Sequence, residues 1–215
     1  MAKVIGIIGE SGSGKTTSMR NLDPKKTFYI DCDKKGLSWK GWKKQYSREL
    51  KNYWDTDDPS MVMNLLKMVN EKESAKAITT VIIDTINGVM VAEEMRNAKA
   101  QGFGKWTDLA QYVWNIFDYC LTMRDDLTVI ILAHSITDTD DNGIVFTHIR
   151  TNGRKLEKIV LESKLTTVLL ATVKDGKYIF KTHADRSSVK TPLGAFEEDE
   201  IDNDIVKVLE ALKDF

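Results

Sequence analysis

The chain carries the stretch GIIGESGSGKTTSMRN at residues 6–21. Within it, GESGSGKT (9–16) matches the pattern G-x-x-x-x-G-K-[ST] at every required position. The apolar run at 3–9 predicts a short buried strand before the motif, and residues 17–21 favour a helix after it. Glycines let the backbone wrap closely around a polyphosphate with its N–H groups pointing inward. A serine/glycine linker would contain similar residues, but the flanking strand and helix favour a phosphate-binding loop.

Two side chains in this loop have specific expected roles. Lys15 is expected to reach the β- and γ-phosphates, and the Thr16 hydroxyl is expected to bind Mg²⁺. The helix N-terminus that follows favours the negative charge of the ligand. The predicted ligand is therefore a nucleoside triphosphate, taken here as ATP, bound with Mg²⁺. The expected binding residues are Gly9, Glu10, Ser11, Gly12, Ser13, Gly14, Lys15, Thr16 and Thr17.

Length and composition limit the class of protein. The 215 residues are enough for one well-buried domain, which we expect to span 1–215. The net charge of −1 means that any nucleic-acid binding must come from a local basic patch. Two cysteines do not make a disulfide scaffold, so a reducing, cytoplasmic location is expected. The apolar run near the start is too short for a signal sequence or a membrane span, and no membrane association is expected.

Three later apolar runs also end in polar residues. Such near-continuous runs, separated by helical stretches, indicate parallel strands that are buried on both faces. In sheets of this kind, ligands bind beyond the carboxyl ends of the strands. The sequence therefore predicts an α/β fold with a mostly parallel central sheet flanked by helices. The runs are TFYIDCD (27–33), which ends in Asp31 and Asp33, TTVIIDT (79–85), which ends in Asp84, and LTVIILAHS (127–135), which includes His134.

The helices between these strands have recognisable starts. Asp58 followed by Pro59 predicts an N-cap and a first helical residue. Thr107 is expected to cap a second helix. Apolar residues at helical spacing from Ile201 to Leu212 predict a third helix near the C-terminus.

Each polar residue at a strand end has a functional interpretation and a structural alternative. Asp84 completes a Walker B motif and could hold Mg²⁺, or it could cap the next helix. Asp33, which we place at the end of the strand beside the phosphate-loop strand, could orient a water for hydrolysis. Its alternatives are solvation and capping. His134 could hydrogen-bond the γ-phosphate, or it could be structural.

The three strand segments resemble those of RecA-type ATPases. YIDCDKKGL is similar to the segment that carries their catalytic glutamate, VIIDTINGV to their Walker B strand, and VIILAHS to the strand that ends in a phosphate-sensing glutamine. The resemblance implies a RecA-like P-loop NTPase core with a C-terminal β-hairpin and a final helix. It also implies a catalytic role for Asp33, a magnesium role for Asp84 and a sensor role for His134. Asp33 is one methylene shorter than glutamate, so hydrolysis is expected to be slow.

Over nearly its whole length, the chain resembles compact bacteriophage nucleotide-binding proteins of the RecA-like single-strand annealing group. The resemblance implies ATP-dependent assembly on single-stranded DNA, strand annealing or recombination, and a homo-oligomeric ring or filament. It suggests a single-strand binding protein as a further partner and the host cytoplasm as the location. A cation from the neighbouring subunit is expected at the γ-phosphate. Among Lys181, Arg186 and Lys190, the last matches best, the alternative being ordinary surface charge.

Three segments are candidates for DNA contact. Residues 34–54 combine seven Lys/Arg with five Trp/Tyr, which is typical of a stacking groove but also of a basic helix with its aromatic side chains in the core. The second candidate is the polar loop after His134, although its aspartates at 138–141 would repel a phosphate backbone. The third is the glycine-containing stretch 98–106. The residues expected to contact DNA in the last two are Lys105, Trp106, Arg150, Arg154 and Lys155.

Two other functions are compatible with the sequence. FYIDCD after a Walker A motif resembles shikimate-type kinases, whose paired aspartates bind the acceptor hydroxyl. The chain lacks their triple-glycine turn and arginine-rich lid, however. An ATP-dependent assembly or loading factor that acts on protein is the second alternative. The N-K-x-D motif that selects guanine does not occur, which argues against a regulatory GTPase.

Overall fold

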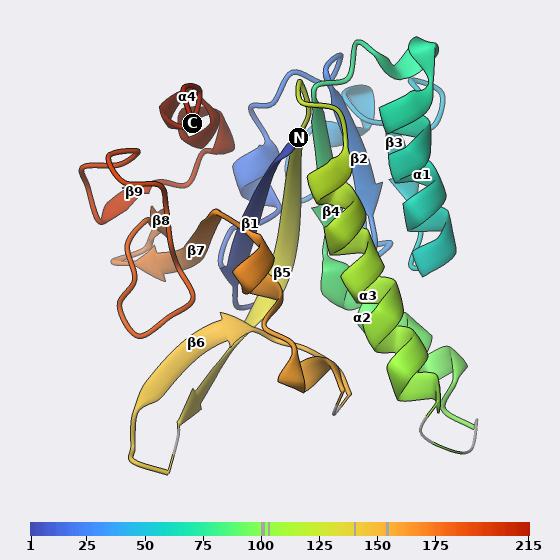
Figure 1. Ribbon diagram of the computed structural model, residues 1–215. Coiled ribbons are helices and arrows are strands. Elements are labelled where there is room, and N and C mark those ends of the chain that lie inside the picture. The colour runs from blue at the N-terminus through green and yellow to red at the C-terminus, as the bar shows by residue number, and fades with distance from the viewer. Residues whose placement is uncertain (100–101, 103, 140, 154) are drawn as a thin grey trace.

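A central β-sheet with helices packed against it forms the framework of the protein in a computed structural model (Figure 1). The structure describes residues 1–99, 102, 104–139, 141–153 and 155–215. The strands are β1 (Lys3–Gly9), β2 (Thr27–Asp31), β3 (Tyr53–Asp55), β4 (Thr80–Asp84), β5 (Thr128–Thr139), β6 (Val145–Ile149), β7 (Thr167–Lys174), β8 (Lys177–Lys181) and β9 (Glu200–Asp202). The α-helices are α1 (Pro59–Glu71), α2 (Ile86–Arg96), α3 (Gly104–Thr122) and α4 (Ile205–Ala211).

The strand order confirms the predicted mostly parallel sheet. In the described residues the order is β3-β2-β4-β5-β1-β7-β8-β9, with β6 paired to β5 outside this path. The pairs among β1 to β5 and between β1 and β7 are parallel, whereas β7, β8 and β9 pair antiparallel. The expected C-terminal hairpin is β7–β8, and α4 is the final helix. Gly9 pairs with His134, and Asp31 pairs with Asp84, so the polar strand ends meet at one edge.

The neighbour of the phosphate-loop strand differs from the prediction. β1 lies between β5 and β7, and β2 is separated from it by two strands, β5 and β4. The expectation that Asp33 follows the strand beside β1 is therefore wrong. The chain crosses over after β1 and leaves two positions in the sheet, which β5 and β4 fill later. Such crossovers are set by long-range packing, and order along the chain does not reveal them.

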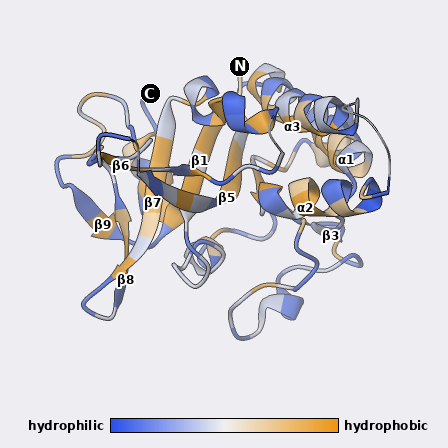
Figure 2. Cartoon of the chain, turned by 90° about the horizontal axis from the view of Figure 1, so that it is seen from below, coloured by the Kyte–Doolittle hydropathy of each residue, from blue (hydrophilic) through white to orange (hydrophobic). Residues whose placement is uncertain are grey.

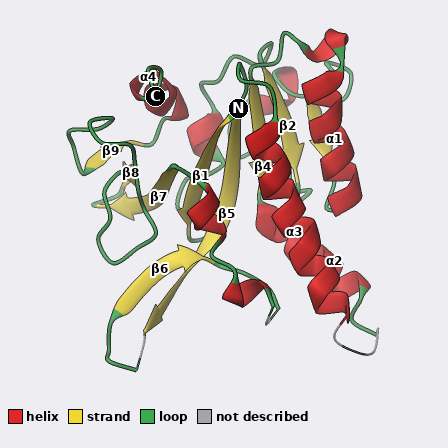
Figure 3. Ribbon diagram, viewed as in Figure 1, coloured by secondary structure: helices red, strands yellow, loops and turns green. Residues whose placement is uncertain are grey.

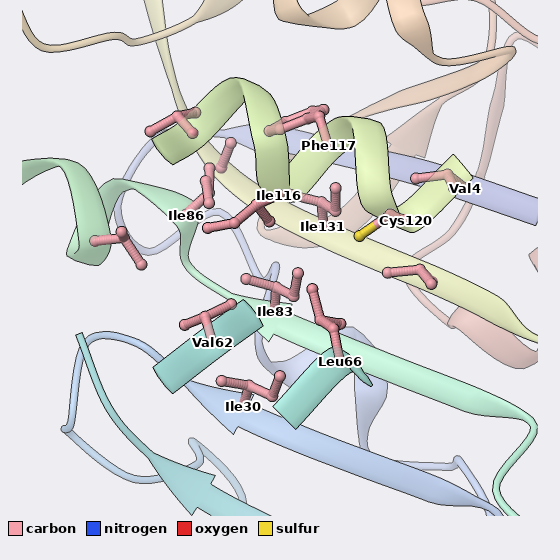
Figure 4. Packing of buried hydrophobic residues seen from close by; sticks show 14 of the residues in the cluster. Val4, Ile30, Val62, Leu66, Ile83, Ile86, Ile116, Phe117, Cys120 and Ile131 are labelled. Carbon is pink, nitrogen blue, oxygen red and sulfur yellow. The ribbon is translucent and has the colours of Figure 1, made fainter. Parts of the chain in front are cut away.

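Apolar side chains fill both faces of the sheet. On one face, α1, α2 and α3 pack against β1, β2, β4 and β5, and Figure 4 shows Val62, Leu66 and Ile83 close together there. A second cluster on the other face includes Tyr29 and is covered by α4 and by loops. Figure 2 shows the apolar residues gathered in the central strands. Burial on both faces explains why these strands read as continuous apolar runs.

The helix starts agree with the sequence in one of three cases. The Asp58 carboxylate accepts a hydrogen bond from the Ser60 N–H at 2.8 Å, which confirms the predicted cap. In contrast, α3 begins at Gly104, so Thr107 lies inside the helix and does not cap it. Trp106 packs against the core, and this burial extends the helix by nearly one turn. None of the helices in the described part of the chain has the length and apolarity needed to cross a bilayer.

The C-terminal apolar stripe is divided between two elements. Ile201 belongs to β9 and pairs with Phe180 of β8, so it is not part of the final helix as predicted. The helix α4 starts four residues later, where the Asp204 carboxylate accepts a hydrogen bond from the Val206 N–H at 3.0 Å. Ile201 has helical spacing to Ile205, but strand pairing decides its conformation.

The helix expected at 17–21 is reduced to a 3₁₀ turn, Thr17–Met19. The Arg20 guanidinium donates a hydrogen bond to the Asn203 carbonyl at 2.9 Å, which ties this turn to the chain before α4. Pro24 follows closely, and a residue before proline is disfavoured in the helical conformation. The sequence signal for a helix start was present, but the chain leaves the helix after one turn.

A β-hairpin replaces the loop expected after His134. β5 continues to Thr139 and pairs antiparallel with β6, and the hairpin projects away from the rest of the sheet (Figure 3). The segment after β8 joins it, because the Thr147 N–H donates to the Arg186 carbonyl at 2.9 Å. The expectation of an irregular loop is therefore wrong. The run of β-branched and aromatic residues at 144–147, Ile-Val-Phe-Thr, is the strand signal that it overlooked.

The aromatic side chains of the basic segment 34–54 face the core. Tyr46 and Tyr53 are buried, and Trp39 and Trp42 pack against the same cluster. This confirms the structural interpretation of the aromatic residues. The predicted basic helix is absent, however, because the described chain here forms turns with only a 3₁₀ turn at Trp42–Lys44.

Candidate nucleotide-binding site

The glycine-rich loop has a backbone that requires glycine. Gly12 and Gly14 have φ angles of +81° and +91°, in the left-handed region that L-residues with side chains rarely adopt. A Cβ atom at Gly9 would lie 2.5 Å from the Ala171 carbonyl oxygen of the neighbouring strand. The three glycines of the motif therefore allow a tight loop to lie directly against the sheet.

A cavity of about 470 Å³ lies beside this loop, within the size range of small-molecule sites. Two lysines, Lys15 and Lys35, are its charged lining groups. An anionic ligand therefore suits it best. The full lining comprises Ser11, Gly12, Ser13, Gly14, Lys15, Thr16, Thr17, Lys35, Ser38, Thr85, His134 and Tyr178. Thus seven of the nine predicted loop residues line it, and Gly9 and Glu10 lie just before them.

Lys15 folds back onto its own loop. Its ammonium donates hydrogen bonds to the carbonyl oxygens of Gly9 and Glu10, both at 2.7 Å. Burial lowers the pKa of Lys15 to about 8, and the nearby Asp84 carboxylate opposes this shift. The ammonium is therefore mostly charged at neutral pH and close to losing its proton. A phosphate group would strengthen its hold on that proton.

Asp84 and Thr16 lie together, as the sequence predicted. The Thr16 hydroxyl donates a hydrogen bond to Asp84 Oδ2 at 2.8 Å, and the Tyr29 hydroxyl donates to the same oxygen at 2.5 Å. The carboxylate is buried, and burial raises its pKa. At the start of α2, the capping position belongs to Thr85, so Asp84 is not a helix cap.

The second oxygen of this carboxylate supports a magnesium site. Asp84 Oδ1 is buried, and it has no hydrogen-bond partner among the described residues. Buried oxygens of this kind are rare unless an ion or water completes them. Mg²⁺ is usually held by one or two protein oxygens together with substrate phosphates. In the described part of the chain no cluster of three His, Cys, Asp or Glu could hold a metal alone. Thr16 and Asp84 Oδ1 would therefore hold Mg²⁺ together with the nucleotide.

Tyr29 is a site residue that the sequence did not reveal. Burial and the Asp84 charge raise its pKa well above 10, so its hydroxyl stays protonated and acts as a donor. It is a polar group in the strand TFYID, and that is the signal that could have indicated it. Its role is to fix the orientation of Asp84, with Oδ2 occupied and Oδ1 left for a cation.

Tyr29→Phe is expected to lower nucleotide hydrolysis about tenfold. The hydrogen bond from Tyr29 lowers the pKa of Asp84 against the effect of burial, so its loss raises that pKa further and lets the carboxylate rotate. One hydrogen bond to a charged group contributes about 1.5–3 kcal/mol. The Mg²⁺ concentration that gives half-maximal hydrolysis should rise accordingly. Tyr46→Phe is the control, because that ring lies 5.6 Å from Tyr29 and does not contact Asp84. Equal effects of both variants would contradict the assigned role.

Asp33 lies near the cavity without lining it. The Thr85 hydroxyl donates to one of its carboxylate oxygens at 3.0 Å, and the Lys35 ammonium donates to the other at 2.5 Å. Asp33 therefore holds Lys35 at the cavity wall, and its role as a water-orienting group stays a prediction. Asp31 is buried and accepts hydrogen bonds from the Tyr53 hydroxyl and from the backbone of the following turn, both at 2.7 Å.

His134 lies at the cavity wall between the loop and the projecting hairpin. Burial and the charge of Lys15 lower its pKa, so the imidazole is neutral near pH 7 and can donate one hydrogen bond. Its backbone N–H donates to the Asn87 side chain at 2.7 Å, and its carbonyl accepts from Arg150 N–H at 2.8 Å. Asn87 in turn donates to the Arg150 carbonyl at 2.7 Å. The sequence analysis missed Asn87, which follows the Walker B aspartate by three residues.

Tyr178 is a second lining residue that the sequence did not reveal. It projects from β8 beside Gly14, where a Cβ on the glycine would lie 2.7 Å from the tyrosine ring. The side chain is about half exposed. Nothing in the sequence marks it, because the sheet order that brings β8 near the loop is set by long-range packing.

Lys190 lies outside this cavity. Its backbone exchanges two hydrogen bonds with Val168 of β7, and the residue is half-buried. It does not appear among the residues that line the cavity of its own chain. Its role toward a neighbouring subunit stays a prediction.

The described residues that were predicted to contact DNA lie outside the nucleotide cavity. Arg150 is exposed at the base of the hairpin. The Lys105 ammonium donates to the Asn97 carbonyl at 3.3 Å, and the Trp106 ring packs beside Gly153. Lys155 lines a separate cavity together with Trp106. The fifth predicted residue, Arg154, lies outside the described residues.

The strand order, the glycine loop and the paired Thr16 and Asp84 define a P-loop nucleotide-binding protein. A family model described as an AAA domain matches residues 1–190, and the chain belongs to this family. Membership indicates nucleotide binding and hydrolysis, and it implies ATP as the ligand, typically with Mg²⁺. A comparison with curated proteins gave no match.

Proposed function

We propose that the protein hydrolyses ATP at this site. The observation that carries the proposal is the buried Asp84 Oδ1, which has no hydrogen-bond partner in the described part of the chain and belongs to the carboxylate that accepts from the Thr16 hydroxyl. The loop amides and Lys15 would bind the phosphates, and the neutral His134 would donate to the γ-phosphate. Asp33 would accept the proton of the attacking water, with Thr85 and Lys35 fixing its position. Bound Mg²⁺ would neutralise charge that develops on the phosphates.

We further propose that ATP binding controls attachment to single-stranded DNA through the β5–β6 hairpin. Phe146 is 44 % exposed on this hairpin, and Arg150 is exposed at its base. Proteins that bind single strands combine aromatic stacking with basic groups. The acidic residues Asp138 and Asp141 lie on the same hairpin, and the first of them is paired with His148 at 2.9 Å.

Asn87 supports a link between nucleotide and hairpin. Its side chain joins His134, at the cavity, to Arg150, at the end of β6, through two hydrogen bonds of 2.7 Å. A shift of His134 toward a γ-phosphate would therefore pull on the strand that carries the hairpin. The proposal includes assembly into a ring or filament, with Lys190 reaching the ATP of the adjacent subunit, and strand annealing as the outcome. The proposal also includes a bacteriophage origin of the protein and a location in the host cytoplasm. A single-strand binding protein is proposed as a further partner.

The proposed role of the hairpin predicts that two substitutions in it lower the affinity for single-stranded DNA at least tenfold. Labelled oligo-dT is titrated with wild-type protein, with and without Mg²⁺ and ATPγS, at two salt concentrations. Binding should require nucleotide, weaken with salt and fall at least tenfold in the double variant Phe146→Ala/Arg150→Ala, since base stacking contributes about 1–3 kcal/mol. Phe215→Ala/Lys213→Ala is the matched control, because it also removes one aromatic and one basic side chain. Both residues are exposed and lie in the segment after α4, outside the hairpin.

Other outcomes of this titration favour the alternatives. DNA binding that ignores nucleotide or is unchanged in the hairpin variant would contradict the proposal. Absence of DNA binding would favour an assembly factor, for which the exposed apolar hairpin residues Val145 and Phe146 offer a protein contact. The kinase alternative is weakened, because Asp31 is buried and already holds two structural hydrogen bonds.

A further inference from the structure

A second groove lies at the amino-terminal edge of the sheet, away from the nucleotide site. It has a volume of about 570 Å³ and lies between the last turns of α1, the start of β2 and the segment 44–52. Its apolar wall includes Leu50, Met68 and Ile78, and Leu50 is 54 % exposed. In Figure 1 this edge is at the top, whereas the glycine loop is at the opposite ends of the strands. The groove is therefore separate from the nucleotide cavity.

Three lysines surround this apolar wall. Lys25, Lys44 and Lys51 line the groove, and the described residues that line it include no carboxylate. None of the three forms an ion pair within the described part of the chain. The neighbouring Glu73 is paired with Lys76 at 3.1 Å. The groove thus combines an apolar wall with three lysines that form no ion pair with any described residue.

The wall formed by segment 44–52 is held in place by a buried side chain. The Asn52 amide donates to the carbonyls of Pro24 and Gln45 at 3.0 and 2.7 Å, and its oxygen accepts from Ser47 N–H at 3.0 Å. Lys51 adopts a left-handed backbone conformation with φ +56°, which is uncommon for a residue other than glycine. The turn thus fixes the backbone of Lys51 beside the groove, and a ligand would meet a wall whose backbone is already in place.

We propose that this groove binds an acidic peptide segment of a partner protein. An apolar side chain of the peptide would pack between Leu50, Met68 and Ile78, and flanking carboxylates would face the lysines. Charge complementarity favours this occupant over an uncharged apolar ligand. It is favoured over a nucleic acid because the aromatic lining residue, Phe28, is only 3 % exposed and offers no surface for stacking bases.

The test uses a fluorescein-labelled octapeptide with a central phenylalanine flanked by aspartates. Fluorescence anisotropy with the full chain should show saturable binding that weakens with salt. A peptide with serine in place of phenylalanine, and one with asparagines in place of aspartates, should each bind at least fivefold more weakly. The variants Lys44→Glu/Lys51→Glu and Leu50→Ser should show a similar loss. All substituted residues are exposed, so thermal unfolding should confirm that each variant is folded.

Two controls separate this proposal from its alternatives. Lys67→Glu/Lys213→Glu makes the same change in net charge at exposed lysines outside the groove and should bind the octapeptide like wild type. Lys15→Met should also retain peptide binding, because the nucleotide site is at the other edge. Peptide binding that is absent, or equally weakened by the control charge reversal, would overturn the proposal. Labelled oligo-dT that loses affinity with Lys44→Glu/Lys51→Glu while the peptide does not bind would identify a nucleic-acid surface instead.

Discussion

Lys15→Met is expected to lower the affinity for Mg·ATP about a hundredfold and to reduce hydrolysis below detection. The Lys15 ammonium lies at the cavity wall, 2.7 Å from two loop carbonyls, and a hydrogen bond from a charged group contributes about 1.5–3 kcal/mol. Titration calorimetry with Mg·ATP measures the change directly. The fold should be unaffected, because methionine keeps the apolar stem of the side chain. Unchanged affinity in a folded variant would remove Lys15 from the site.

The same lysine predicts the pH dependence of binding. Its pKa of about 8 in the free protein lies below the ordinary value of 10.5, because burial disfavours the charge. Bound phosphates favour the ammonium and raise that pKa, so binding takes up a proton above pH 8. Affinity for ATP should therefore be constant at pH 6.5–7.5 and should fall by up to about tenfold for each further pH unit above 8. This pH dependence should be absent in Lys15→Met. A wild-type affinity for ATP that stays constant up to pH 9.5 would contradict the assigned role of the Lys15 proton.

Asp84→Asn is expected to lower hydrolysis about 100–1,000-fold and at the same time to stabilise the folded protein near pH 7. Asparagine keeps an oxygen that accepts from Thr16 and Tyr29, but it removes the negative charge that would hold Mg²⁺. Loss of one such charge costs about 3–4 kcal/mol in the transition state. Steady-state hydrolysis at saturating Mg²⁺ measures this effect.

The sign of the stability change follows from the pKa of Asp84. Burial raises this pKa in the folded state above that in the unfolded state, so the folded form resists ionisation. The wild-type free energy of unfolding should therefore decrease as pH rises from the pKa of Asp84 in the unfolded state through its pKa in the folded state. It should stay at the lower value at pH values above the folded-state pKa. Asp84→Asn lacks this penalty, and we expect its Tm at pH 7 to be about 2–4 °C higher, which corresponds to about 1 kcal/mol. A lower Tm in thermal unfolding without nucleotide would contradict the assignment of Asp84 as a buried, underpartnered charge.

Much of this site could be predicted from the sequence because its signals are local. The glycine loop, Lys15 and Thr16 occupy fixed positions in one motif, and Asp84 follows an apolar strand. Parallel strands that are buried on both faces expose polar residues only at their ends, so the strand ends had to meet at one edge. The pairing of Gly9 with His134 in the sheet agrees with this expectation, because it places the end of β5 beside the start of the glycine loop.

The remaining features depend on contacts between distant parts of the chain. The hydrogen bond between Tyr29 and Asp84 joins residues 55 positions apart, and Tyr178 reaches the loop from β8. Tyr178 has no local signature, and the hydroxyl of Tyr29 within a buried strand does not indicate its partner, because strand order is set by packing of the whole sheet. The 3₁₀ turn after the loop was missed for a related reason: Arg20 is anchored to a carbonyl 183 residues away.

A crystal structure with Mg²⁺ and the non-hydrolysable analogue AMP-PNP tests the central claim most directly. The account predicts that Lys15 contacts the terminal phosphates and that Thr16 Oγ1 lies about 2.0–2.1 Å from the metal. Asp84 Oδ1 should face the same ion, bound directly or through one water. A nucleotide bound elsewhere, or a metal held without Thr16 and Asp84, would contradict the account.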